Sequence, residues 1–88
     1  GLRPTYGRVP RHGAMTLCWS MDKIGPMARS VEDCALILSV LHGADGLDAA
    51  AVDRPFDWPC PRPVAKLKVG YTGEADQPEL RVLKELGV

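Results

Sequence analysis

Few residues in this sequence could act as catalytic nucleophiles. A nucleophilic serine needs a base placed to take its proton, and the serines are Ser20, Ser30 and Ser39. Ser20, three residues before Lys23, forms the nominal Ser/Lys pair, whereas Ser30 precedes an apolar run as a helix cap would and Ser39 lies within that run. No serine stands between glycines in an elbow motif. We therefore assign no catalytic residue in this chain.

The cysteines and histidines do not have metal-ligand spacing. Cys18, Cys34 and Cys60 are an odd number of widely spaced thiols, which fits neither a disulfide framework nor a paired-cysteine metal site. His12 and His42 lie thirty residues apart and share no ligand pattern with the thiols. The sequence thus predicts reduced thiols and no metal. It also contains no phosphate-binding glycine loop.

Charge is balanced overall but unevenly distributed. Eleven basic and eleven acidic residues give no net charge at pH 7, so no global field favours nucleic acid or an anionic membrane. The first thirty residues are basic, with Arg3, Arg8 and Arg11 around Tyr6. Arginines beside an aromatic ring can grip single-stranded nucleic acid, or they can simply link segments of the chain. We keep nucleic-acid binding as an alternative.

A rigid turn and a single arginine precede the apolar run. Gly25 and Pro26 set the turn, and Arg29 follows within reach of Asp22, Asp33 or a group outside this segment. An ion pair that fixes the turn is the favoured interpretation, with direct substrate contact as the alternative.

Two helices and a strand are expected to position these residues. Ser30 and Asp33 have the types and spacing of a helix start, the hydroxyl accepting from a first-turn amide and Asp33 reaching back to the cap. The helix over 31–41 is apolar on so much of its surface that it must be covered on more than one side. Further along, Leu67–Tyr71 is predicted as a strand, and the segment after it as a helix capped by Asp76 with Pro78 in its first turn.

The domain prediction divides one partial domain, residues 1–88, into three parts. Residues 1–43 hold the motif segment and the core helix, residues 44–63 form a Pro/Asp-rich connection that Phe56 and Trp58 are expected to anchor, and residues 64–88 form a strand–helix unit. Ala14–Met21 and short pieces near Thr5 and Arg8 are further strand candidates. The chain begins without methionine and stops after a helix, and we expect it to be an internal fragment of a larger fold.

Two motifs in order carry a family resemblance. "GLRPTYGRV" (1–9) followed by "SMDKIGPMARSVEDCALILSVLHGADGLD" (20–48) closely resembles the amidase signature family, and "VAKLKVGY" (64–71) is similar to the next strand of that family. The resemblance implies an α/β fold, a mixed sheet covered by helices. Pro10, where many members have Ser, and the short 73–77 turn depart from the pattern and leave the subfamily and the substrate open.

The resemblance also implies a reaction. Members hydrolyse amides, or release ammonia for transamidation, with two serines and a lysine that lie upstream of the first motif, so this chain carries none of them. Asp22, Gly25, Pro26 and Arg29 are then expected to support the substrate cleft, and Ser30 to cap the helix beside it. No cofactor or metal is implied.

The expected partners are a small-molecule amide and the remainder of the amidase domain, with no membrane. The alternatives are an A subunit of a glutamyl-tRNA(Gln) amidotransferase, the one case in which nucleic acid is expected, and a stand-alone nucleic-acid- or protein-binding module. The longest apolar run is too short to span a bilayer and no signal segment opens the chain. We therefore expect a cytoplasmic protein.

Overall fold

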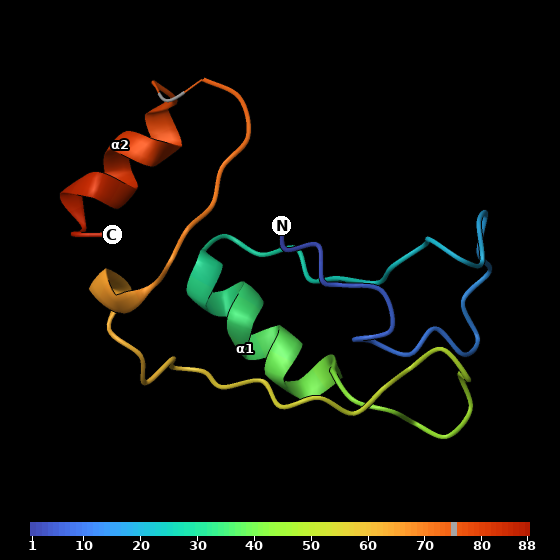
Figure 1. Cartoon of the computed structure of the whole chain (residues 1–88). Helices are drawn as coiled ribbons and strands as arrows, with labels where there is room; N and C mark the ends of the chain where they lie inside the picture. Colours follow the sequence, from blue (N-terminus) through green and yellow to red (C-terminus); the bar gives the residue numbers. More distant parts are fainter. Residues whose placement is uncertain (75) are drawn as a thin grey trace. The chain divides into compact units, whose positions relative to one another are not determined.

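The computed structural model describes residues 1–74 and 76–88, and helices are the regular elements in them (Figure 1). The elements are α1 (Val31–Leu41), the 3-10 turn η1 (Val64–Lys66) and α2 (Pro78–Glu85). The chain divides into an N-terminal unit, Gly1–Trp58, and a C-terminal unit, Pro59–Val88. Each unit is described by itself below.

α1 begins and ends where the sequence predicts. Ser30 is the N-cap, and its Oγ accepts a hydrogen bond from Asp33 N at 3.0 Å. This bond satisfies one of the amide groups that a helix start leaves without an intrahelical partner. At the other end His42 is the C-cap, and Gly43 follows at a φ of 109°, a backbone conformation that favours glycine.

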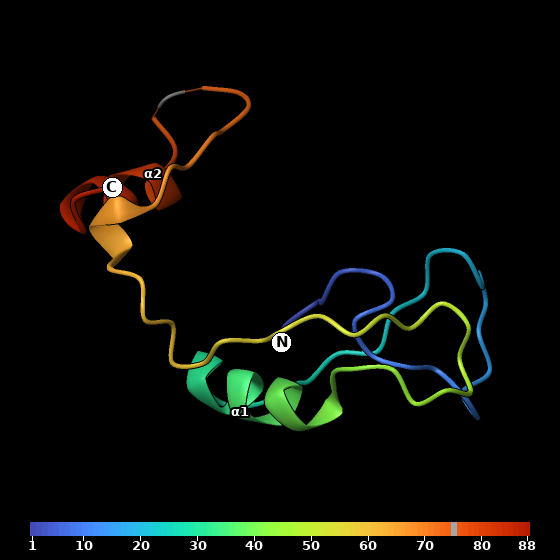
Figure 2. The same cartoon turned by 60° about the horizontal axis from the view of Figure 1, so that its bottom comes forward.

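The core of the N-terminal unit is small and lies along one face of α1. Cys34, Ala35 and Leu38 are buried there, and Val9 is buried in the motif segment before the helix. The chain between 52 and 58 passes alongside α1 (Figures 1 and 2). Phe56 from this stretch packs at a tilted angle against His42, with 5.8 Å between ring centroids. The connection is thus anchored by an aromatic contact at Phe56, as predicted, whereas Trp58, expected to anchor it as well, is 41% exposed.

In the C-terminal unit, α2 packs beside the extended segment that precedes it. Pro78 occupies the first turn, as predicted, but the N-cap is Gln77, and no side chain caps it. The prediction of Asp76 as the cap is wrong, because its carboxylate forms hydrogen bonds of 2.7–2.9 Å to the Arg81 guanidinium instead. Ala75, where the expected helical segment opens, lies outside the described residues.

The strand predictions are wrong for the described residues. Leu67–Tyr71 is extended but belongs to no sheet, and Ala14–Met21 contains bends and a turn. The pieces near Thr5 and Arg8 are turns and bends as well. A strand is defined by hydrogen bonds to a neighbouring strand, and residues 1–74 and 76–88 provide no such neighbour. The mixed sheet implied by the resemblance is therefore not formed by this part of the chain.

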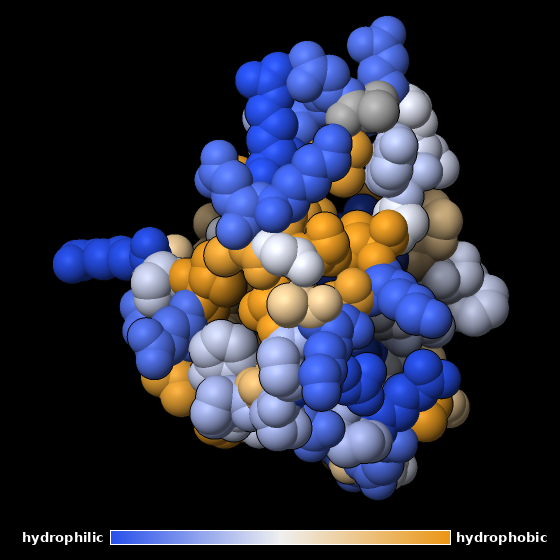
Figure 3. Space-filling model, turned by 60° about the vertical axis from the view of Figure 1, so that its left-hand side comes forward, coloured by the Kyte–Doolittle hydropathy of each residue, from blue (hydrophilic) through white to orange (hydrophobic). Residues whose placement is uncertain are grey.

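The surface carries many large apolar side chains. Met15, Leu17 and Val40 are among the most exposed, and Figure 3 shows hydrophobic residues open to view among charged ones. Isolated exposed apolar residues are normal, but extensive apolar surface marks contacts with other protein. In the described part of the chain, neither α1 nor α2 combines the length and hydrophobicity required to traverse a bilayer.

Candidate functional site

Gly7–Arg11, at the end of the first sequence motif, forms hydrogen bonds to several distant segments of the N-terminal unit. We call these five residues the motif segment. Arg8 donates from Nη1 to the carbonyl oxygen of Arg54 at 3.0 Å and from Nη2 to that of Pro55 at 3.1 Å. Its own carbonyl oxygen accepts from Gly43 N at 3.0 Å. The motif is therefore tied both to the end of α1 and to the connection beyond it.

Gly7 allows this motif to approach the connection closely. Its φ is +77°, and a Cβ at this position would collide with the carbonyl oxygen of Ala50. The Gly7 carbonyl accepts a hydrogen bond from Val52 N at 2.9 Å. Glycine is needed here for two reasons, the left-handed backbone and the lack of a side chain.

Arg11 joins three segments of the unit. Its backbone N and its Nε both donate to Asp48 Oδ2, at 2.8 and 3.2 Å. The side chain of Arg11 is 10% exposed and that of Asp48 is 11% exposed. Its guanidinium also donates to the carbonyl oxygens of Trp19 and Asp22. The planar guanidinium can serve several acceptors at once, and here it links the motif to the loop before α1 and to the loop after it.

Tyr6 completes this cluster. The Arg11 guanidinium carbon lies 4.8 Å from the centroid of the Tyr6 ring, and Arg11 Nη2 donates to the Tyr6 hydroxyl at 3.1 Å. The hydroxyl donates onward to the carbonyl oxygen of Trp19 at 3.1 Å. We call Tyr6, Arg11, Trp19, Asp22 and Asp48 the Arg11 cluster.

Asp22 organises the loop before the turn. Its Oδ2 accepts hydrogen bonds from Leu17 N at 2.6 Å and from Cys18 N at 2.8 Å. The hydrogen bonds from Cys18 N and Leu17 N hold the pKa of the Asp22 carboxyl below its ordinary value, because they stabilise the charged form. Asp22 thus acts on its own loop and does not contact Arg29.

The loop after α1 uses carboxylates in the same way. The pKa of Asp48 is lowered by hydrogen bonds from Ala50 N and Arg11 N, and that of Asp45 by hydrogen bonds from Asp48 N and Leu47 N. These loops are held by acids that accept from backbone amides.

Gly25 and Pro26 form a close crossing with the start of the chain. Leu2 N donates to the carbonyl oxygen of Pro26 at 2.9 Å. A Cβ on Gly25 would overlap the Leu2 carbonyl oxygen and lie 2.6 Å from Pro4 Cδ. Gly25 and Pro26, two of the four residues expected to support a cleft, therefore join the two sequence motifs, and a shallow pocket of about 320 Å³ lies along this crossing.

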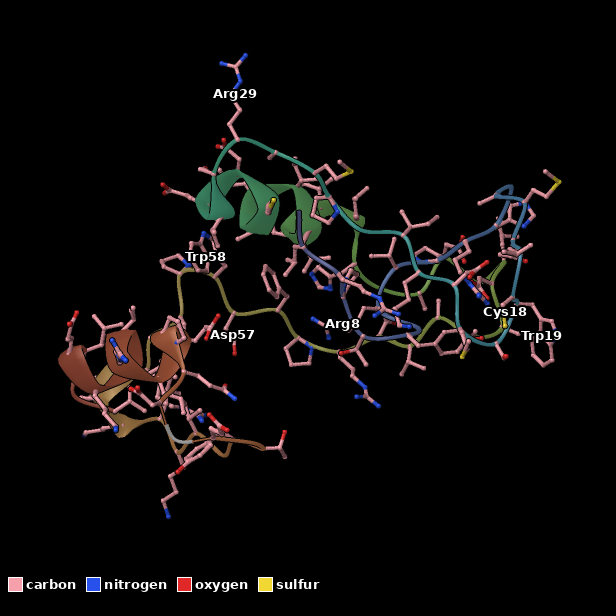
Figure 4. The ribbon with its side chains drawn as sticks, turned by 90° about the horizontal axis from the view of Figure 1, so that it is seen from above. Arg8, Cys18, Trp19, Arg29, Asp57 and Trp58 are labelled. Atoms are coloured by element: carbon pink, nitrogen blue, oxygen red, sulfur yellow. The ribbon has the colours of Figure 1, made fainter. Side chains whose placement is uncertain are left out.

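Arg29 does not make the ion pair that the sequence favoured. It is exposed, and its side chain extends away from α1 into solvent (Figure 4). The ion pairs within residues 1–74 and 76–88 are Arg11–Asp48 and Arg81–Asp76. The turn is held by Leu2 and by the Cys34 thiol, which lies 3.9 Å from the Pro26 carbonyl oxygen.

The described residues contain no assembled catalytic group. Lys23 Nζ donates to the Met21 carbonyl oxygen at 2.7 Å, whereas the Ser20 hydroxyl lies 3.5 Å from Cys18 Sγ. Ser20 and Lys23 thus share no hydrogen bond in the structure. Across residues 1–74 and 76–88, His, Cys, Asp and Glu side chains do not gather in threes as a metal site would require.

Two of the three arginines around Tyr6 form contacts within the N-terminal unit, whereas Arg3 is exposed. Arg8 and Arg11, which the sequence left open for nucleic acid, bind carbonyl oxygens and Asp48 within the unit. Asp48 was not identified as a site residue from the sequence. The available signal was its position shortly after a helix, next to small residues, where aspartate commonly accepts from turn amides.

Comparison with known proteins identifies the family. The family model described as Amidase matches residues 1–84, and this chain belongs to that family, the amidase signature family. No solved structure matches the chain.

Three curated relatives are much longer than this chain, and each of the three is named as the A subunit of a glutamyl-tRNA(Gln) amidotransferase. The chain is 58% identical to the relative from Roseiflexus sp. over 62% of the chain. It is 48% identical to the relative from Azotobacter vinelandii over 84% of the chain, and 42% identical to that from Thermus thermophilus over all of it. The chain spans 11%, 16% and 21% of the lengths of these three relatives.

Proposed function

We propose that this chain is the structural support of a cleft in an enzyme that cleaves carbon–nitrogen amide bonds by acyl transfer to serine. The observation that carries the proposal is the Amidase family match over residues 1–84. In the proposed reaction a serine outside this chain attacks the carboxamide carbon, ammonia leaves, and water releases the acid. Residues 1–88 supply no reacting group, and no metal or cofactor takes part.

The proposed support acts through the loops on either side of the turn. Asp22 fixes the loop at Leu17 and Cys18, and Gly25 allows the turn to pack against Leu2. Rigid positioning of groups around a reacting centre contributes strongly to catalysis. Arg29, exposed beside the Ser30 cap, is free of ion pairs in the described structure and is proposed to face substrate or the rest of the domain.

A second candidate function is transamidation, with this chain as part of an A subunit. It is favoured by the three relatives whose names give that function, at 42–58% identity. Ammonia released from glutamine or asparagine would then be passed to a charged tRNA, and other subunits and tRNA would be partners. We propose a cytoplasmic location for either enzyme, because free, widely spaced thiols are typical of a reducing compartment.

The test uses the full-length protein, expressed from the complete open reading frame that encodes residues 1–88. Ammonia release is measured with glutamine, asparagine and simple carboxamides, first with the protein alone and then with candidate partner subunits and glutamyl-tRNA. Release without partners supports a free amidase, and release only with partners and tRNA supports the transamidation enzyme. Absence of ammonia release from every amide in both settings would refute the proposed chemistry.

A stand-alone binding module is disfavoured by the internal use of Arg8 and Arg11. Salt-dependent binding of oligonucleotides to residues 1–88, weakened by Arg3→Ala, would support that rival. We expect no such binding, since counter-ion release requires several basic side chains free to reach phosphates.

A further inference from the structure

The loop of residues 17–22 is closed on itself by hydrogen bonds. The Asp22 carboxylate accepts from Leu17 N and Cys18 N through Oδ2, at 2.6 and 2.8 Å. The amide groups of Met21 and Asp22 in turn donate to the Cys18 carbonyl oxygen, at 3.0 and 2.8 Å. These bonds give the loop a fixed internal shape, and we call residues 17–22 the Asp22 loop.

Arg11 and Tyr6 hold the Asp22 loop in place within the N-terminal unit. Arg11 donates from Nη1 to the carbonyl oxygens of Trp19 and Asp22. The Tyr6 hydroxyl donates to the carbonyl oxygen of Trp19 at 3.1 Å. Apolar packing does not supply this anchorage, because Leu17 and Trp19 are 99% and 75% exposed and Trp19 lies at the edge of the unit (Figure 4). The place of the loop therefore depends on polar contacts, and Arg11 reaches two points of it.

Asp48 orients the Arg11 guanidinium for this contact. Its Oδ2 accepts from the backbone N and the Nε of Arg11, while its Oδ1 accepts from Ala50 N at 2.9 Å. Both carboxylate oxygens are thus engaged, and the pair is largely withdrawn from solvent, where salt screens a pair of charges little. The loop after α1 therefore fixes the loop before it, with Arg11 as the connection between them.

A pocket of about 240 Å³ opens beside the Asp22 loop, and Arg11, Asp22 and Lys23 are among the residues that line it. We propose that Arg11, oriented by Asp48, is a positioning residue of the amide-cleaving enzyme: it holds the Asp22 loop, and with it this pocket, where substrate is bound. The proposal rests on the proposed function, in which this loop supports the substrate cleft. Small displacements of groups around a bound substrate are costly to catalysis.

The test compares Arg11→Lys with Arg8→Lys in the full-length protein. Lysine keeps the positive charge beside Asp48, but one ammonium group cannot serve that carboxylate and both loop carbonyl oxygens as the guanidinium does. Arg8 is the matched control, because it also donates to two carbonyl oxygens, those of Arg54 and Pro55. In the described part of the chain, the Arg8 side chain forms no hydrogen bond with the Asp22 loop.

Two measurements separate positioning from a general loss of stability. Amide hydrogen exchange of residues 17–22 should be about 10-fold faster in Arg11→Lys and unchanged in Arg8→Lys, because only the first change releases the loop. For an amide that the unmodified protein cleaves, KM should rise about 10-fold in Arg11→Lys and stay unchanged in Arg8→Lys. A smaller amount of folded enzyme would lower the apparent kcat alone, whereas a displaced pocket raises KM.

If Arg11→Lys does not fold, Asp48→Asn replaces it, since this variant keeps an oxygen acceptor and removes only the charge that orients Arg11. The same rise in KM and the same faster exchange are then expected. Unchanged exchange of residues 17–22, or the same KM in the Arg11 and Arg8 variants, would overturn the positioning role while ammonia release by the unmodified protein still supports the proposed function. No ammonia release from any amide by the unmodified protein would refute the proposed function and this proposal with it.

Discussion

The substitution Gly7→Ala tests whether the motif segment is fixed by close packing. Two costs are expected at this position. An L-residue at a φ of +77° costs about 1–2 kcal/mol relative to glycine. The new Cβ would also overlap the Ala50 carbonyl oxygen, and forcing an extra methyl into packed structure costs about 1–3 kcal/mol.

Displacing this crossing would also strain the hydrogen bond from Val52 N to the Gly7 carbonyl, 2.9 Å long, which is worth about 0.5–1.5 kcal/mol. The backbone and overlap costs of Gly7→Ala sum to about 2–5 kcal/mol, and any loss of this hydrogen bond adds to that sum. Gly46→Ala is the matched control, because Gly46 has a φ of +75° with nothing within 4 Å of its Cβ position. Its expected loss is the backbone cost alone, about 1–2 kcal/mol.

The assay is equilibrium urea unfolding of the full-length protein, followed by tryptophan fluorescence and circular dichroism together. We expect the order of stability to be unmodified protein, Gly46→Ala, then Gly7→Ala, with the two variants separated by about 1–3 kcal/mol. Equal losses for both variants would refute the reasoning, since the backbone conformation alone would then account for the effect and the contact with Ala50 would contribute nothing.

Other sites make separate predictions. Gly25→Ala should lower the free energy of unfolding by about 1–3 kcal/mol through overlap at the crossing, and Gly70→Ala, with open space around it, should change it little. Arg11→Leu should destabilise the protein more than the double variant Arg11→Leu/Asp48→Leu does, because the single variant leaves the Asp48 carboxylate, only 11% exposed, without its cation. A loss of unfolding free energy in the double variant equal to the sum of the two single losses would contradict this prediction. The pKa values of Asp22 and Asp48 are lowered in the folded state. The stability that these two carboxylates contribute is therefore present above the pKa of unfolded aspartate, about 3.9, and is lost as pH falls through their lower pKa in the folded protein. The stability gap between the unmodified protein and Asp22→Asn, measured by urea unfolding from pH 7 to 3, should therefore close in acid, and a constant gap would be the contrary result.

Local patterns in the sequence predicted α1 well. The Ser30 cap and the Gly43 stop are interactions between near neighbours in the chain, and both appear in the structure. Pro78 in the first turn of α2 is likewise a local signal. Such features are predictable because their partners lie within a few residues, where residue type alone sets the geometry.

The Arg11 cluster was not predictable in this way. Arg11 meets Asp48 across 37 positions of sequence, and nothing in the spacing of either residue indicates the other. Charge composition favoured arginines free to bind nucleic acid, whereas carbonyl and carboxylate oxygens of the same unit accept hydrogen bonds from the guanidinium groups of Arg8 and Arg11. The prediction for Arg29 failed in the opposite way, because Asp22 and Asp33 are close to Arg29 in the sequence but do not form an ion pair with it in the structure.

The failed strand predictions and the exposed apolar residues of α1 have a common physical cause. Both Leu67–Tyr71 and the face bearing Val40 have sequences suited to contact with further protein: the first has the composition of a sheet strand, and the second the hydrophobicity of a covered helix. Within residues 1–74 and 76–88 the segment has no neighbouring strand, and Val40 is 83% exposed. Local pattern therefore indicates which segments suit contact with further protein, whereas the contact itself depends on neighbours that the pattern does not specify. Residues 7–11, by contrast, find their hydrogen-bond partners within the N-terminal unit, at Gly43, Asp48 and Val52, so we expect this region to keep its structure without further protein.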